Sequence, residues 1–226
     1  MRTKTLLLAA ALTAASALPS MAQVYSVNIV GYINLTLPKG FSLIANQLNG
    51  SPDNKLETVI PAPPENTTIY KFNPNPPAHF EAFNFSADNP GWFPANQTLS
   101  PGEGAFIAID PAFAPTGTTL TLVGEVQLAS NLPVINGFSL LSSVIPQSGV
   151  LDTDLGFPVR ENDNVYRWNP TLSGGKGGYD NYNFSADNPG WFPAFPPLKV
   201  GEGFFISGDP QQGPARTWSR TFTVGP

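Results

Sequence analysis

The chain of 226 residues contains no cysteine and a single histidine, His79. The lack of cysteine excludes disulfide bonds, and with one imidazole it also excludes ordinary zinc sites, which need several such ligands. A catalytic triad would have to use His79, which lies in a proline-rich stretch without a nucleophile elbow elsewhere in the chain. We therefore expect a protein that is not an enzyme and that binds no metal ion or cofactor.

Charged residues are also scarce, at 12% of the chain, and 16 acidic residues outnumber 11 basic ones. The net charge of −5 and the lack of a basic cluster argue against nucleic acid as a partner. One apolar run, Leu6–Leu12, follows Arg2 and Lys4 and is too short to span a bilayer. With the small residues of the exit Ser20-Met21-Ala22, it is typical of a secretory signal peptide. We predict a signal peptide over residues 1–22, a secreted, cell-surface or periplasmic location, and no transmembrane span.

Proline and glycine are abundant, at 25 and 21 residues, and they separate short runs of β-branched and aromatic residues. This composition is typical of short strands joined by tight turns. Alternation with period two marks the clearest strands, over residues 32–37, 68–72 and 118–123. Helical candidates are brief: residues 54–60, with Asp53 as the cap, and residues 151–155, with Asp152 as the cap.

The sequence is also repeated internally. Twelve residues, NFSADNPGWFPA, occupy positions 84–95 and recur unchanged at 183–194. Shorter matches lie at residues 40–43 and 137–140 (GFSL) and at residues 102–104 and 201–203 (GEG). A period of nearly one hundred residues fits two copies of a small domain better than a solenoid.

We therefore predict an all-β chain of two tandem, similar, small antiparallel sandwich or barrel modules, each with one short helical turn. The first module covers residues 23–124 and the second covers residues 125–226. The junction is strand-like over residues 119–128 and lacks linker composition, so the modules should hold a fixed relation. The predicted core comprises Phe41, Leu43, Tyr70, Phe72, Phe106 and Ile107 in the first module, and Phe138, Leu140, Tyr166, Trp168, Phe205 and Ile206 in the second.

The order of these motifs resembles a β-rich module that is common in secreted bacterial proteins. In that module a strand like GWNLISLP opens the unit, and a hairpin like EPGxGYWV lies near its end. Phe41 and Phe138 stand where the module usually has tryptophan, and Phe106 and Phe205 stand where it has an aromatic residue. The resemblance covers nearly the whole chain after residue 22. It implies a β-rich fold and an extracellular location, and it brings no catalytic residues.

Two further motifs have simple structural interpretations. Glu103 and Glu202 each lie inside a Gly-Glu-Gly turn, where a carboxylate is most simply solvated or paired with a backbone N–H. The glycine-rich residues 173–178 lack the Gly-Lys-Ser/Thr ending of a phosphate-binding loop, so they predict a hairpin loop.

The repeated twelve residues are the strongest candidate site. Residues 89–92, Asn-Pro-Gly-Trp, predict a type II turn, and two aromatic residues follow it. These aromatics either plug the open end of each module or form an exposed platform for a sugar or a partner protein. Gene conversion would explain the identity without a physical cause. The candidate ligand-binding residues are Asp88, Trp92 and Phe93 in the first copy and Asp187, Trp191 and Phe192 in the second.

Asp88, with Asn84 and Asn89, offers oxygen atoms to calcium, but the segment lacks the alternating acidic ligands of dedicated calcium loops. We therefore expect no metal site there.

These observations predict a secreted or cell-surface, non-enzymatic structural or interaction protein built from two β modules. The alternative is a pair of carbohydrate-binding modules that use exposed tryptophans. The expected partner is a protein or a polysaccharide at the cell surface. Because residues 32–35 and 221–224 resemble the two halves of the internal junction, chains could also associate head to tail. The alternative is a monomer in which both terminal strands pair within their own modules.

Overall fold

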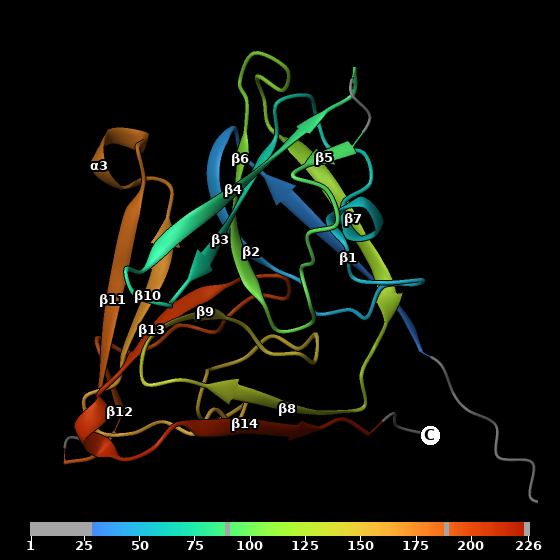
Figure 1. The fold of residues 1–226 in the computed structure, drawn as a ribbon. Coiled ribbons are helices and arrows are strands. Elements are labelled where there is room, and N and C mark those ends of the chain that lie inside the picture. The colour runs from blue at the N-terminus through green and yellow to red at the C-terminus, as the bar shows by residue number, and fades with distance from the viewer. Residues whose placement is uncertain (1–28, 89–90, 188–189, 224–226) are drawn as a thin grey trace, which may run out of the picture.

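The computed structural model describes residues 29–88, 91–187 and 190–223 (Figure 1). The predicted signal peptide, residues 89–90 and 188–189 at the predicted turns, and residues 224–226 lie outside the described residues. Within the described ranges, no helix has the length and apolar character needed to cross a membrane.

The first module is a sandwich of two antiparallel sheets. Its first strand, β1 (Val30–Leu37), pairs with its last, β7 (Thr118–Glu125), in a two-stranded sheet. The other strands form a five-stranded sheet in the order β2-β6-β3-β4-β5. Their bounds are β2 (Gly40–Ala45), β3 (Thr68–Asn73), β4 (His79–Ser86), β5 (Gly91–Phe93) and β6 (Gly104–Ile109).

The second module repeats this topology strand for strand. Its first strand, β8 (Ala129–Val134), pairs with its last, β14 (Arg216–Thr221), along the bottom of Figure 1. The five-stranded sheet has the matching order β9-β13-β10-β11-β12. Its bounds are β9 (Gly137–Leu141), β10 (Asn164–Asn169), β11 (Gly178–Ser185), β12 (Gly190–Phe192) and β13 (Phe204–Gly208). The prediction of an all-β chain with two similar antiparallel modules is confirmed, and each module is a sandwich.

The helical elements are short. Helix α2 (Leu56–Val59) lies inside the predicted range of residues 54–60. The N-cap residue of this helix is Lys55, without a side-chain capping bond, so the prediction of Asp53 as the cap is wrong. The Asp53 carboxylate instead accepts hydrogen bonds from the Thr58 hydroxyl and the Lys55 N–H. These bonds, chiefly the one from Thr58, lower the pKa of Asp53.

The predicted helix of the second module is wrong. Residues 151–155 form hydrogen-bonded turns, and Asp152 accepts a hydrogen bond from the Trp191 indole instead of capping a helix. A one-turn element, α3 (Leu172–Gly175), occurs instead in the glycine-rich stretch, where Ser173 and Gly174 have positive φ. The remaining element is the short 3-10 helix η1 (Pro210–Gln212).

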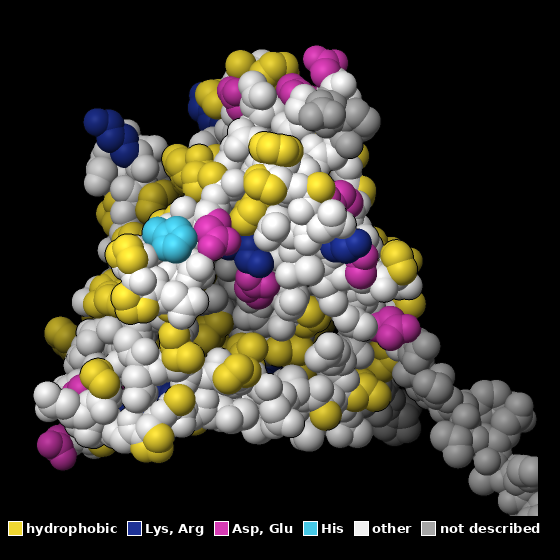
Figure 2. Space-filling view, in the orientation of Figure 1, with side chains coloured by type: hydrophobic (Ala, Val, Ile, Leu, Met, Phe, Trp, Pro, Cys, Tyr) yellow, Lys and Arg dark blue, Asp and Glu magenta, His cyan; other side chains and the backbone are white. Residues whose placement is uncertain are grey.

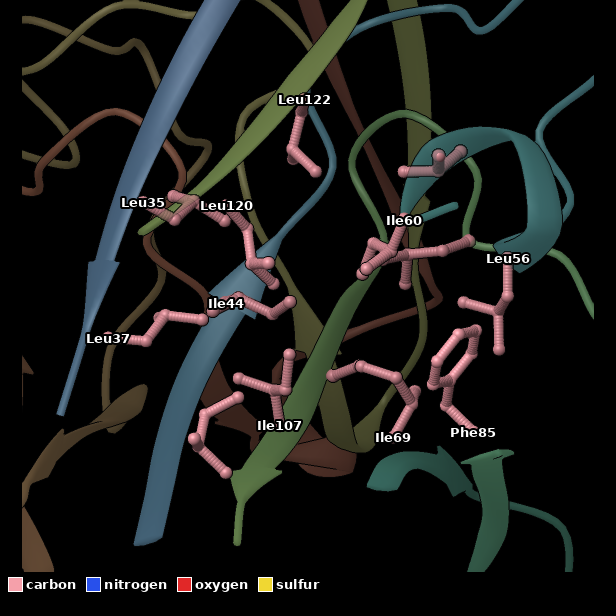
Figure 3. Packing of buried hydrophobic residues seen from close by; sticks show 14 of the residues in the cluster. Leu35, Leu37, Ile44, Leu56, Ile60, Ile69, Phe85, Ile107, Leu120 and Leu122 are labelled. Atoms are coloured by element: carbon pink, nitrogen blue, oxygen red, sulfur yellow. The ribbon is translucent and has the colours of Figure 1, made fainter. Parts of the chain in front are cut away.

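The core of each module lies between its two sheets. Burial alternates along β1, where Ile33, Leu35 and Leu37 face inward, as the period-two pattern predicts. Figure 3 shows aliphatic side chains converging from four strands, with Leu56 and Ile60 beside them: Leu35 and Leu37 of β1, Ile44 of β2, Ile107 of β6, and Leu120 and Leu122 of β7. The second core is more aromatic and includes Phe157, Phe204 and Trp218.

The predicted core residues lie in three different environments. Ile107 and Ile206 are fully buried in the module cores, as predicted. Phe41 and Phe138 are 45% and 49% exposed, so their prediction as core is wrong. The others form a separate cluster between the modules: Leu43, Tyr70, Phe72, Phe106, Leu140, Tyr166, Trp168 and Phe205. The reason is that each five-stranded sheet is apolar on both faces, so the pattern along a strand cannot tell which face is internal to its module.

The contact between the modules is aromatic and comes in matched pairs. Phe72 meets Phe205 edge to face with ring centroids 5.2 Å apart, and Trp168 meets Phe106 in the same way at 5.1 Å. Phe80 and Tyr179 flank these pairs in equivalent positions. We call these six rings the aromatic layer. Burial raises the pKa of Tyr179, consistent with its place in this layer.

Backbone hydrogen bonds between the modules also come in matched pairs. The Ala45 N–H donates to the Gly201 carbonyl at 2.8 Å, and the equivalent Ser142 N–H donates to the Gly102 carbonyl at 2.9 Å. The Gly-Glu-Gly turns meet at this point. A Cβ on Gly203 would lie 2.6 Å from the Ile44 carbonyl oxygen, so only glycine permits the approach. The two modules are thus related by an approximate two-fold axis.

This symmetry bears on the predicted head-to-tail association. Both terminal strands pair within their own modules, β1 with β7 and β14 with β8. The internal contact uses the same face of each module, which is the isologous kind of contact and not the head-to-tail kind. Association between chains stays a prediction, and it would need surfaces other than those that join the modules.

The second module also contains a buried ion pair. Asp163 and Arg216 lie 2.7 Å apart with both side chains almost fully buried, and the Arg160 N–H donates to the same carboxylate. The equivalent positions in the first module hold Thr67 and Thr118, as the matching strand registers show. The same backbone therefore accommodates either this ion pair or two uncharged threonines, and the Thr67 hydroxyl donates to the Pro64 carbonyl.

Truncating Phe106 or Phe205 to Ala should lower the free energy of unfolding by about 3–5 kcal/mol, because each removes a buried ring from the contact between modules. Urea titration followed by circular dichroism measures the loss, with exposed Phe113→Ala as the control. The double variant should lose less than the sum of the two, because the rings contact the same cluster. Losses under about 1 kcal/mol at both sites would contradict this packing.

Replacing Asp163 by Ala should cost about 3–5 kcal/mol of unfolding free energy, because it leaves the buried Arg216 guanidinium without its counter-ion. Lys55→Ala, which breaks an exposed ion pair with Asp53, should cost less than about 1 kcal/mol. The double replacement Asp163→Thr with Arg216→Thr copies the first module and should recover much of the loss. Equal losses for Asp163→Ala and Lys55→Ala in urea titrations would refute the burial of this pair.

Candidate binding surfaces

The repeated twelve residues form an edge hairpin in each five-stranded sheet. In the first copy β4 pairs with β5, and Phe85 lies opposite Trp92. The Trp92 ring is 3% exposed, packs on Phe85 with centroids 5.6 Å apart, and donates its indole N–H to the Ile60 carbonyl at 2.9 Å. Trp92 therefore plugs the module core, and its expected use as an exposed platform is wrong.

Trp191, the equivalent residue, is half-buried. Its ring packs against Phe184 and Phe195, and its indole N–H donates to the Asp152 carboxylate at 3.1 Å. Both tryptophans thus have partners within their own module, and neither presents a free ring edge with an unused N–H.

The exposed aromatic residue of each hairpin is the phenylalanine that follows. Phe93 is 72% exposed and Phe192 is 75% exposed, because adjacent strand residues point to opposite faces. These two side chains do not plug the modules, so that interpretation is wrong for them. Asp88 and Asp187, at the hairpin tips, are also exposed. The structure thus places Phe93 and Asp88 on the surface of one hairpin and Phe192 and Asp187 on the surface of the other.

Both hairpins are anchored in the same way by residues outside the repeat. The Ala87 N–H donates to the Glu65 carboxylate at 2.6 Å, and the Ala186 N–H donates to the Glu161 carboxylate at 2.5 Å. The sequence offers one weak signal for these two glutamates, the asparagine that follows each of them, Asn66 and Asn162. The matched anchors mean that the two tips have equivalent supports as well as identical sequences.

A second candidate surface is a groove of about 660 Å³ at the junction of the modules. It runs between β1 and β2 of the first module and β10, β11 and residues 196–203 of the second. Arg167 and Glu202 form a two-pronged ion pair in its wall, with N–O distances of 2.8 and 2.9 Å. Glu202 also accepts the Lys199 N–H, which confirms the predicted role of this turn carboxylate as a partner for a backbone N–H.

Other charged groups are dispersed. On the face shown in Figure 2, the basic side chains lie beside acidic ones. Lys71 pairs with Glu103 and Lys55 pairs with Asp53. His79 is exposed and contacts the Pro77 carbonyl and Glu81. Among the described residues, no three His, Asp or Glu side chains are grouped to hold a metal ion.

No family model, curated protein or solved structure matches this chain. The predicted resemblance to a module of secreted bacterial proteins therefore stays a prediction, and function has to be argued from the surfaces themselves.

Trp92→Ala should lower the free energy of unfolding by about 3–5 kcal/mol, because it empties the end of the first core. Phe93→Ala and Phe192→Ala should change it by less than about 0.5 kcal/mol, because these rings are in solvent. Urea titration of the three variants measures the difference. A large loss at either phenylalanine would show that its ring is packed, and it would remove that residue from the candidate surface.

Proposed function

We propose that this protein is a secreted or cell-surface, non-enzymatic interaction protein that contacts its partner through two equivalent hairpins. The observation that carries the proposal is the exposure of Phe93 and Phe192 at matching places in the two modules. A phenylalanine in solvent adds little to folding, while an aromatic ring is well suited to burial against a partner.

The internal repeat adds a second argument. Even buried positions differ between the modules, as Phe83 and Tyr182 or Ala105 and Phe204 show. Packing therefore does not require identical side chains at equivalent positions. Identity at an exposed position such as Phe93, within an unchanged run of twelve residues, is explained by two surfaces that recognise the same chemical group.

Two identical surfaces on one rigid body support two-point attachment to a partner that offers the same group twice. A cell-surface polysaccharide or a repetitive or dimeric surface protein fits that requirement. Two-point binding raises the apparent affinity well above that of either contact alone. Carbohydrate binding is the alternative function, with Phe93 and Phe192 as the rings instead of the tryptophans. The scarcity of basic residues supports a partner other than nucleic acid.

Retention on cell envelopes and on insoluble cellulose, chitin and peptidoglycan tests the proposal. The wild-type protein should sediment with at least one of these. Phe93→Ser and Phe192→Ser should each weaken apparent affinity by about tenfold or more, because one of two contacts is lost. The double variant should not be retained.

Phe113→Ser is the matched control, because Phe113 is exposed and lies outside the repeat. It should bind like the wild type. Retention of the double Phe93/Phe192 variant at the wild-type level would overturn the role of the hairpins, and a wild-type protein that sediments with none of the four materials would contradict a cell-surface partner.

A further inference from the structure

The groove at the module junction has a composition that the hairpins lack. Its walls come from both modules, so it exists only when the two five-stranded sheets are in contact. Its volume of about 660 Å³ lies within the range of small-molecule sites. None of its lining residues belongs to the repeated twelve, so it is independent of the surfaces that carry the proposed function.

The charges in the groove balance. Arg167 and Lys199 contribute two positive charges, and Asp180 and Glu202 contribute two negative ones. Arg167 is already paired, because it binds Glu202 through two nitrogens and donates to the carbonyls of Pro196 and Pro197. A groove without excess charge, whose arginine is already paired, favours a neutral ligand over a phosphate or a polycation.

Hydrogen-bonding groups without partners among the described residues line the same groove. The side-chain Oδ1 of Asn34 accepts a hydrogen bond from the Thr121 hydroxyl. This bond fixes the orientation of the side-chain amide and leaves its NH₂ group free to donate to a ligand. Asp180 binds Asn169 through one carboxylate oxygen and keeps the other. The Tyr182 hydroxyl can donate and accept.

The two modules differ at the residues that supply these groups. Tyr182 of β11 lies opposite Val165 of β10. The residue of β4 that is equivalent to Tyr182 is Phe83, which has no hydroxyl. Trp168 borders the groove too, but its ring packs on Phe106 and Tyr179 and its indole N–H donates to the Phe41 carbonyl. The second module thus contributes to the groove a hydroxyl that the first module lacks at the equivalent position. Several free donors and acceptors in a groove without excess charge suit a neutral ligand that has many hydroxyl groups.

We propose that this groove binds a short, neutral oligosaccharide. Asn34 donates to a sugar hydroxyl, Asp180 accepts from one, and Tyr182 does either. The ligand bridges the modules, because Asn34 belongs to the first and the other two residues to the second.

Calorimetric titration of the purified protein tests this assignment. The probes are neutral trisaccharides (maltotriose, cellotriose, xylotriose, mannotriose and N-acetylated chitotriose), the charged trigalacturonate, and an uncharged proline-containing tetrapeptide. At least one neutral trisaccharide should bind saturably, and trigalacturonate and the peptide should bind more weakly. Asn34→Ala and Tyr182→Phe should each weaken binding by about fivefold or more, because each removes one hydrogen bond.

The chain supplies a matched control in Asn131. It is the counterpart of Asn34 in β8, it accepts from Ser219 as Asn34 accepts from Thr121, and it lies outside the groove. Asn131→Ala should leave binding unchanged. Asn34 is exposed, so its variant should fold normally even if Tyr182→Phe does not.

Three results would overturn the proposal: no binding of any neutral trisaccharide at millimolar concentration, equal effects of Asn34→Ala and Asn131→Ala, or tighter binding of trigalacturonate or the peptide. Hairpin variants at Phe93 and Phe192 should bind the trisaccharide like the wild type, so failure of the hairpin proposal and failure of this one are distinguishable.

Discussion

The face-to-face contact of the two five-stranded sheets is the interaction on which the rest of the structure depends. It covers the aromatic faces that would otherwise lie in water, and it requires glycine at the turn of residues 201–203, where the two backbones approach closely. Because the contact includes backbone hydrogen bonds from Ala45 and Ser142, it fixes the relative position of the modules as well as their distance. The groove and the spacing of the two hairpins are both consequences of this one contact.

The topology and the repeat could be predicted from sequence because they depend on local signals. Alternation of apolar and polar residues identifies β1 without knowledge of its partner strand. In the same way, the glycines at 102 and 201, which have positive φ, identify the turns at those positions. The face that each apolar residue occupies could not be predicted in this way. Phe106 and Ile107 are adjacent and both apolar, yet one packs between modules and the other inside a module. Only the arrangement of the two modules decides between these positions.

The candidate site shows the same limit. The repeated segment was found because its two copies have the same sequence. The role of each of its rings depends on which face of the strand points toward the core. Trp92 points inward and Phe93 outward because they are neighbours on β5. The groove could not be predicted, because Asn34 and Tyr182 are far apart in the sequence and meet only across the junction. Neither residue belongs to a motif that would have drawn attention to it.

The modules are therefore alike in topology and in the sequence of their hairpins, and they differ at many other side chains, including Phe72 and Trp168 where they meet. The Thr67 and Thr118 positions of the first module become a buried ion pair in the second, and Phe83 becomes Tyr182. A symmetric contact preserved between diverged halves allows one half to acquire a property that the other lacks. A groove walled by both modules, but with polar atoms supplied mainly by the second, is a product of that divergence.

The approximate two-fold axis has a consequence for how the protein behaves at low concentration. Two separate modules joined by such a contact would form a dimer that dissociates on dilution, as a protein released from a cell would experience. Residues 126–128 join the two modules and make the contact intramolecular. For so short a connection, the effective concentration of one module near the other is roughly millimolar or above. The groove and the paired hairpins then survive at any dilution, because their assembly no longer depends on a second molecule.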